Sequence, residues 1–202
     1  MVERPRVEPG APYRLVSLDG SPGEPETTVA FGSSEDALVA RFRSVAEPPL
    51  TLAVVRANEP VYRDECVELF LASPAEPGRY LELVVNPLGV LYSARVLNPH
   101  DDRTRWELSP GAPGIALPGV EVSIAGPGGE PASWCWWSAT IRVAFALLAP
   151  APPACPPDSL LVNATRIARG TRTRHLALSP TYRTSPPDFH VPSRFANLVL
   201  SP

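Results

Sequence analysis

Short apolar runs with a period of two dominate the hydrophobic pattern of this chain. In residues 37–45 (ALVARFRSV), the apolar positions Leu38, Ala40 and Phe42 alternate with polar ones, and residues 140–148 (TIRVAFALL) alternate in the same way. Successive side chains of a β-strand point to opposite faces, so this pattern predicts strands that are buried on one side.

Similar runs recur along the chain and are separated by clusters of proline and glycine. The expected strands are 12–18, 37–45, 50–57, 66–72, 80–86, 89–97, 119–124, 140–148, 159–168, 175–179 and 195–200. The 27 prolines exclude long helices, because proline breaks a helix interior. About ten short strands of this kind predict an all-β fold, a single antiparallel β-sandwich.

Length and composition set the domain organisation and exclude some partners. We expect one domain over residues 1–202, with residues 1–34 as an N-terminal extension and first strand. The net charge is −3, which excludes the basic surplus of a nucleic-acid-binding protein. No run approaches the 18 or so apolar residues of a membrane span. The start, MVERPRVEPG, has no apolar signal segment, which predicts a cytoplasmic protein, or a secreted one if the chain is trimmed.

The stretch 61–71 (VYRDECVELFL) places acidic residues in a run that otherwise predicts a strand. Acidic residues are depleted in strands, so their presence needs a reason. From residue 66 onward the odd positions are apolar and should face the core, which directs Glu68 outward. Asp64 and Glu65 lie at the strand's entrance, where turn or metal contacts are expected.

Residues 80–86 (YLELVVN) show the same parity, so Glu82 also faces outward. The short connection between the two runs predicts an antiparallel hairpin, with Glu68 and Glu82 on one outer face. Like charges on neighbouring strands destabilise a sheet by up to about 1 kcal/mol. Two alternatives offset this: arginine partners that close an ordinary outer face, or a polar concave face whose carboxylates accept hydrogen bonds from sugar hydroxyls.

VYRDECVELFL, followed by YLELVVNPLGVLYSARV, resembles the family 9 carbohydrate-binding modules and the related DOMON-like domains. The chain's later stretches VNATRIARG and LALSPTYRTSPPDFHVPSRFANLVL resemble the closing part of that family, and WCWWSATIRVAFALL resembles its Trp-led strand. The resemblance spans roughly residues 35–202. It implies a β-sandwich and a non-catalytic domain that binds a carbohydrate ligand between aromatic rings.

Carried onto this chain, the resemblance implies a binding site on the concave sheet. Tyr62 matches an aromatic position before the acidic strand, Glu68 the strand carboxylate and Asn163 a polar residue of a later strand. The expected binding face comprises Tyr62, Glu68, Glu82, Asn86, Asn163 and Arg166.

One position departs from the family pattern. Where the family often has a tryptophan before the SPT turn, this chain has Leu178, so a stacking ring would have to come from Trp106, Trp136 or Trp137. This departure and the missing signal segment favour an alternative hypothesis: a structural or protein-interaction β-sandwich, with a protein partner, that has lost sugar binding.

Other candidate chemistry is limited. No nucleophile elbow, zinc-binding helix or phosphate loop is present, and two carboxylates on an open sheet face predict no hydrolase. We expect no metal or cofactor: Asp64 and Glu65 alone make a poor calcium site, and haem would normally need a methionine ligand, whereas the only Met is the first residue.

Three single residues complete the expectations. His190 in PDFHVP is expected to lock the last strand rather than to bind ligand, and His100 to be exposed. Cys66, one of three widely spaced cysteines with Cys135 and Cys155, is expected on the outer face beside Glu68, where it should be a poor nucleophile.

Overall fold

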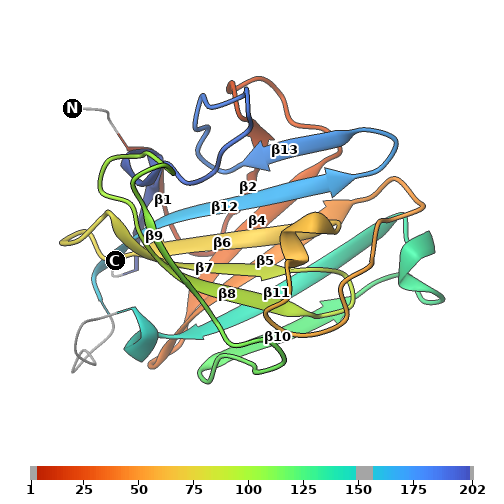
Figure 1. Cartoon of the computed structure of the whole chain (residues 1–202), viewed down its shortest axis with the longest axis horizontal. Coiled ribbons are helices and arrows are strands. Elements are labelled where there is room, and N and C mark those ends of the chain that lie inside the picture. The colour runs from red at the N-terminus through yellow and green to blue at the C-terminus, as the bar shows by residue number, and fades with distance from the viewer. Residues whose placement is uncertain (1–3, 149–156, 201–202) are drawn as a thin grey trace.

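A computed structural model describes residues 4–148 and 157–200. Within these residues fourteen strands form two sheets that lie one over the other (Figure 1). The first sheet has nine strands and the second has five, and the strand pairs are antiparallel except for the parallel pair of β1 and β14. The predicted all-β antiparallel sandwich is confirmed.

The nine-stranded sheet runs in the order β1 (Arg6–Val7), β14 (Ala196–Val199), β12 (Ser159–Arg169), β6 (Cys66–Ala72), β7 (Arg79–Val85), β8 (Leu91–Leu97) and β9 (Glu107–Pro110), with β13 (Thr173–Ala177) beside β12 and β3 (Val16–Ser17) beside β13. The five-stranded sheet runs in the order β10 (Val120–Ala125), β11 (Trp136–Ala144), β5 (Ala37–Val45), β4 (Thr27–Ser33) and β2 (Pro12–Arg14). Short 3₁₀ turns are η1 (Val61–Arg63), η2 (Pro131–Ser133), η3 (Phe145–Leu147) and η4 (Pro192–Arg194). No helix of the described residues is long and apolar enough to cross a membrane.

The core between the sheets follows the predicted alternation. Val67, Leu69 and Leu71 of β6 are all buried there, opposite residues such as Phe42 and Ile141 of the five-stranded sheet. Burial of each such side chain stabilises the fold by about 1.5–3 kcal/mol. The hairpin of β6 and β7 therefore has the orientation that the sequence predicted, with its odd positions facing the core.

The outer face of the nine-stranded sheet is covered rather than open. All seven positions of β6 are buried, and Phe70, Tyr80 and Tyr92 belong to a second apolar cluster on this face. Phe189 and Phe195, from the segment that precedes β14, also belong to this cluster. The expectation of an open, polar sheet face is thus wrong, because large apolar side chains alternate there with the two glutamates and need cover.

Residues 50–57 do not form the strand that their apolar character predicted. The backbone amides of Ala53 and Val54 donate to the carboxylate of Asp64 instead of pairing with a neighbouring strand. Conversely, β4 pairs with β5 along its length although residues 1–34 were expected to hold only a first strand and an extension. The inward side of β4 has only two large apolar residues, Val29 and Phe31, so the alternating pattern that would have predicted this strand is short.

Candidate functional site

The two acids at the entrance of the stretch 61–71 stabilise the scaffold. Asp64 is fully buried, and its carboxylate accepts hydrogen bonds at 3.0 Å from the amides of Ala53 and Val54 and from the side chain of Asn86. A buried carboxylate with this many donors holds its loop in place. It has no oxygen directed to a ligand site.

Glu65 is paired with Arg166 between the two sheets. The guanidinium Nη2 of Arg166 lies 2.6 Å from Oε1 of Glu65, and the indole of Trp137 donates to the same oxygen at 3.1 Å. Nη1 of Arg166 reaches across to Thr27 Oγ1 and the carbonyl of Val45 in the five-stranded sheet, each at 2.7 Å. Burial lowers the pKa of this arginine, and the charge of Glu65 opposes the effect.

The position of Arg166 corrects the expected binding face. The residue pairs with the inward-facing Val67 in register, so its side chain enters the interior of the sandwich. It links the sheets and does not face the outer side on which a ligand was expected.

Asn86 and Asn163 are also engaged within the protein. The side-chain oxygen of Asn86 accepts from the backbone amides of Leu88 and Val90 at 3.1 and 3.0 Å, which closes the turn after β7. Asn163 exchanges two 3.1 Å hydrogen bonds with the backbone of Ser179. Neither asparagine lines the pocket described next, so the structure brings together only part of the expected binding face.

A pocket of about 210 Å³ lies on the outer face of the nine-stranded sheet. Its floor comes from β6, β7, β8 and β12, and its walls come from η1, β9, β13 and two loops. The lining residues are Tyr62, Glu68, Glu82, Tyr92, Arg103, Trp106, Leu108, Ile167, His175, Pro187, Phe189 and His190.

Glu68 and Glu82 form the polar floor of this pocket. They are diagonal neighbours on β6 and β7, since Glu68 is opposite Val84 and Glu82 is opposite Phe70. Both side chains are more than nine-tenths buried, at 3% and 5% exposed. Oε2 of Glu68 accepts a hydrogen bond from Thr165 at 2.8 Å. Glu82 makes no hydrogen bond to the described residues that the structure records.

Burial determines the protonation of this pair. It raises the pKa of Glu68 to about 7, against the opposing effects of the hydrogen bond from Thr165 and the charge of Arg103. Burial and the nearby charge of Glu68 raise the pKa of Glu82 to about 8. The pair therefore retains about one proton near neutral pH, and it offers both hydrogen-bond donors and acceptors to the pocket.

His190 combines the expected structural role with a place in the pocket wall. Its Nδ1 lies 2.9 Å from the hydroxyl of Tyr80, and its carbonyl accepts from the side chain of Asn98 at 2.9 Å. Its Nε2 lies 3.6 Å from Oε1 of Glu82. Burial lowers the pKa of His190 to about 3, so the imidazole is neutral and supplies no positive charge.

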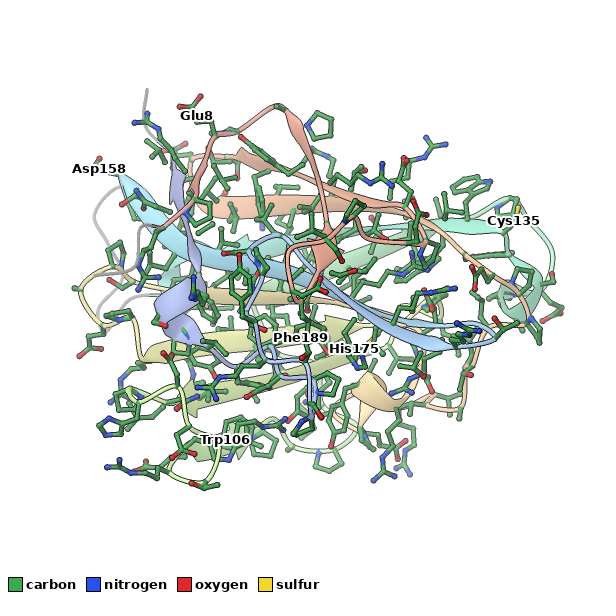
Figure 2. The ribbon with its side chains drawn as sticks, turned by 90° about the horizontal axis from the view of Figure 1, so that it is seen from above. Glu8, Trp106, Cys135, Asp158, His175 and Phe189 are labelled. Atoms are coloured by element: carbon green, nitrogen blue, oxygen red, sulfur yellow. The ribbon has the colours of Figure 1, made fainter. Side chains whose placement is uncertain are left out.

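Aromatic rings surround the floor. Tyr62, 41% exposed, meets the ring of Tyr92 edge to face at 5.5 Å, and Trp106 meets the ring of His190 at 4.7 Å. Figure 2 shows His175 and Phe189 next to each other over the sheet, with their ring centres 5.7 Å apart. At Glu68 and Glu82 the covering residues thus leave an aromatic-lined pocket, and arginine pairs do not close it.

Trp106 is the tryptophan that supplies a ring to the pocket. Trp137 is fully buried between the sheets, and Trp136 lies on the five-stranded sheet beneath the guanidinium of Arg43. Leu178, at the position where the related family often has tryptophan, packs against the core between the sheets. Its side chain does not line the pocket, so this departure removes no ring from it.

The cysteines follow the expectation where the structure describes them. Cys66 is buried, and burial together with the charges of Glu68 and Glu65 raises the pKa of its thiol. Cys135 is exposed and lies near one end of the molecule in Figure 2, away from the labelled residues Trp106, His175 and Phe189. Cys155 lies outside the described residues.

Metal ligands do not gather in the described part of the chain. No group of three or more histidine, cysteine or acidic side chains is placed to hold an ion there. Asp64 and Glu65, the residues considered for calcium, point to different partners, because one holds the preceding loop and the other pairs with Arg166.

A second cavity, of about 500 Å³, lies at another edge of the nine-stranded sheet and is lined by Leu81, Leu97 and Leu148 among others. Its charged residues are Glu76, Arg79, Arg95 and Glu107, two of each sign, and all four are exposed. Glu76 and Arg79 lie 3.4 Å apart. It lacks the buried carboxyl groups without a charge partner that distinguish the smaller pocket.

Sequence reasoning found Tyr62, Glu68 and Glu82, named Trp106 as one of three possible stacking rings and considered His190, but it missed the other lining residues. Tyr92 could have been found by parity, because it is opposite Val84 on the outer face. Arg103, Pro187 and Phe189 of the loops and His175 of β13 gave no such signal, since no periodicity links them to the sheet.

Comparison with known proteins defines the fold. No family model matches the chain, and no curated protein is similar to it in sequence. Among solved structures, it is similar to a candidate carbohydrate-binding protein of Bacteroides uniformis, with 18% identity, coverage of 94% of this chain and 85% of the other, and a TM-score of 0.71.

Two structures of a family 9 carbohydrate-binding module from Caldicellulosiruptor kristjanssonii are also similar. One is a complex with cellotriose (12% identity, 98% and 94% coverage, TM-score 0.60) and the other a complex with glucose (12% identity, 98% and 96% coverage, TM-score 0.58). The chain therefore has the fold of the family 9 carbohydrate-binding modules. The DOMON-like part of the resemblance is not confirmed.

Proposed function

We propose that this chain is a non-catalytic carbohydrate-binding domain and that the pocket over Glu68 and Glu82 holds one sugar ring. The observation that carries the proposal is a pair of buried carboxyl groups at the floor of an aromatic-lined pocket. Glu82 has no hydrogen-bond partner that the structure records among the described residues, so its polar atoms are available to a ligand.

The chemistry of the pocket suits a sugar. A pyranose has hydroxyl groups that both donate and accept hydrogen bonds, and a carboxyl pair that shares a proton can do both in return. The rings of Tyr62, Trp106 and Phe189 offer apolar surface to the C–H faces of the sugar. A volume of about 210 Å³ is below the roughly 300–1,000 Å³ of drug-sized sites, which favours a single ring.

The similar structures support the same ligand class. The Caldicellulosiruptor modules are described in complex with cellotriose and with glucose, and the Bacteroides protein is described as a candidate carbohydrate-binding protein. At 12–18% identity their fold is shared, so the proposal for this chain depends on its own pocket.

A binding role is favoured over hydrolysis by the two carboxyl groups themselves. A glycosidase keeps one carboxyl ionised while the other is protonated, and opposite environments separate their pKa values. Here the same cause, burial, raises both pKa values, to about 7 for Glu68 and about 8 for Glu82. Cleavage also needs sugar units on both sides of the scissile bond, for which a pocket of one ring leaves little room.

Calorimetric titration with glucose, cellobiose and cellotriose tests the proposal. We expect binding that Trp106→Ala weakens by about tenfold or more, because stacking and ring burial contribute roughly 1–2 kcal/mol. Trp136→Ala is the matched control, since this tryptophan lies on the other sheet beside Arg43. A folded protein that shows no heat with any sugar at millimolar concentration contradicts the proposal and favours the alternative of a protein-interaction domain.

A further inference from the structure

The pocket carries acidic groups without a paired cation. Thr165 occupies one oxygen of Glu68, Oε2, and no hydrogen bond is recorded to its Oε1 among the described residues. Both oxygens of Glu82 are without a recorded hydrogen bond there, and Oε1 lies 3.6 Å from Nε2 of the neutral His190. Three carboxyl oxygens of two neighbouring side chains that line one small cavity are thus without a recorded hydrogen bond among the described residues.

Arg103, which lines the pocket, and Arg169 both have partners other than the two glutamates. Arg103 lies with its guanidinium 3.7 Å from Asp188 and 4.8 Å above the ring of Trp106, and its side chain is about half exposed. Arg169 donates to the carbonyl of Tyr62 at 3.0 Å, which holds η1 in place. The charge of Arg103 lowers the pKa of both floor glutamates, but burial has the larger effect and raises them.

The rings that line the cavity add to this preference for positive charge. The face of an aromatic ring is negative and attracts a cation within about 6 Å of its centre. Tyr62, Tyr92 and Trp106 lie around the floor, with Phe189 in the wall. Trp106 already holds the guanidinium of Arg103 in this way, at 4.8 Å, which shows that a ring of this pocket accepts a cation.

We propose that the pocket prefers a sugar that carries a protonated amino group, with the ammonium held between Glu68 and Glu82. This rests on the proposed sugar-binding function and names the class of sugar. An ammonium group has three N–H donors, which matches the three free carboxyl oxygens in number. A neutral hydroxyl in the same place donates one proton and gives neither acid a charge partner.

The arrangement also predicts proton release. The other titratable or charged groups near the two acids are Tyr62, Cys66, Tyr80, Tyr92, Arg103, Arg169, His175 and His190. Burial raises the pKa of Tyr80 and Tyr92 and lowers that of His175 and His190, so these four side chains stay neutral at pH 7. Burial also raises the pKa of the Cys66 thiol, so it carries no charge at pH 7. An ammonium ion should therefore displace the proton that the glutamate pair retains, because an opposite charge favours the ionised carboxyl.

The test compares glucosamine, N-acetylglucosamine and glucose by calorimetry at pH 7 in two buffers of different ionisation enthalpy. We expect glucosamine to bind at least about tenfold more tightly than the two neutral sugars, since charge-assisted hydrogen bonds are roughly twice as strong as neutral ones. It should release up to one proton on binding, and the neutral sugars should release none. Glu82→Gln should remove most of the preference, whereas the control Glu121→Gln, at an exposed site on β10, should keep it.

The outcomes are distinguishable. Equal binding of glucose and glucosamine overturns the inference and leaves the sugar-binding function standing. Absence of binding by all three sugars to the folded protein overturns both. Cyclohexylamine is the fourth probe, because it has a ring and an ammonium but no hydroxyl groups. Binding of cyclohexylamine as tightly as glucosamine overturns the assignment to a sugar in favour of a general amine site. Circular dichroism of each variant confirms that it is folded.

Discussion

Replacing Glu82 by glutamine should stabilise the protein, and the gain should grow with pH. In the unfolded chain this carboxyl has a pKa near 4.5, and burial beside Glu68 raises it to about 8 in the folded state. Between these values the folded state holds a proton that the unfolded state has released. Stability is therefore lost progressively as the pH rises from about 4.5 to about 8, and the loss is complete above that range.

The size of the effect follows from the same two values. Each tenfold change in proton affinity corresponds to about 1.4 kcal/mol, so a rise from 4.5 to about 8 sets a limit on the order of 5 kcal/mol. Glutamine keeps the shape of Glu82 without the charge. We expect Glu82→Gln to gain several kcal/mol over the wild type at pH 9, and close to nothing at pH 4.5, where the buried glutamate is protonated.

Urea denaturation at pH 4.5, 7 and 9 measures this difference, with the midpoint and slope fitted at each pH. Glu121→Gln is the control, because an exposed substitution should change the free energy of unfolding by less than about 0.5 kcal/mol at every pH. A Glu82→Gln protein that is no more stable than the wild type at pH 9 would refute the reasoning. It would mean that Glu82 is not desolvated in the folded state.

Two further predictions concern the scaffold. Arg166→Met should destabilise the fold by about 3–5 kcal/mol in urea denaturation, because it leaves the charge of Glu65 buried without its partner. Arg142, which is partly exposed and paired with the exposed Asp36, is the control: Arg142→Met should change the free energy of unfolding by less than about 1 kcal/mol, and equal effects would contradict the buried pair. In the native protein a maleimide reagent should label Cys135 and leave Cys66 unlabelled until urea unfolds the chain, as read by peptide mass mapping. Rapid labelling of Cys66 in the native state would show that the outer face is open.

The alternation of β6 and β7 shows how far local pattern can be read. Odd positions in both strands are apolar, so their inward orientation and the outward orientation of Glu68 and Glu82 follow from strand geometry alone. The short connection between them gave the hairpin, and the hairpin placed both glutamates on one face. This part of the site was predictable because it depends on neighbours in the sequence.

Strand β12 shows where local pattern ends. Polar residues occur on both of its faces, with Asn163 and Thr165 on one and Arg166 on the other. The sequence pattern therefore does not indicate which face of β12 points inward, and an arginine is normally expected on the outer face. Only the tertiary structure supplies the buried Glu65 and the backbone of the second sheet that make an inward Arg166 stable.

The sequence by itself determined the all-β class, the central hairpin and the outward direction of Glu68 and Glu82, because strand periodicity and turn residues act over a few positions. The tertiary structure alone decided that loops cover the outer face, that Asp64 and Glu65 serve the scaffold, and that Trp106, His175 and Phe189 form the walls (Figure 2). These outcomes depend on contacts between residues far apart in the chain. Such contacts form to bury the apolar side chains that alternate with the acids. The residues that cover these side chains cannot be identified from the pattern of any short stretch of sequence.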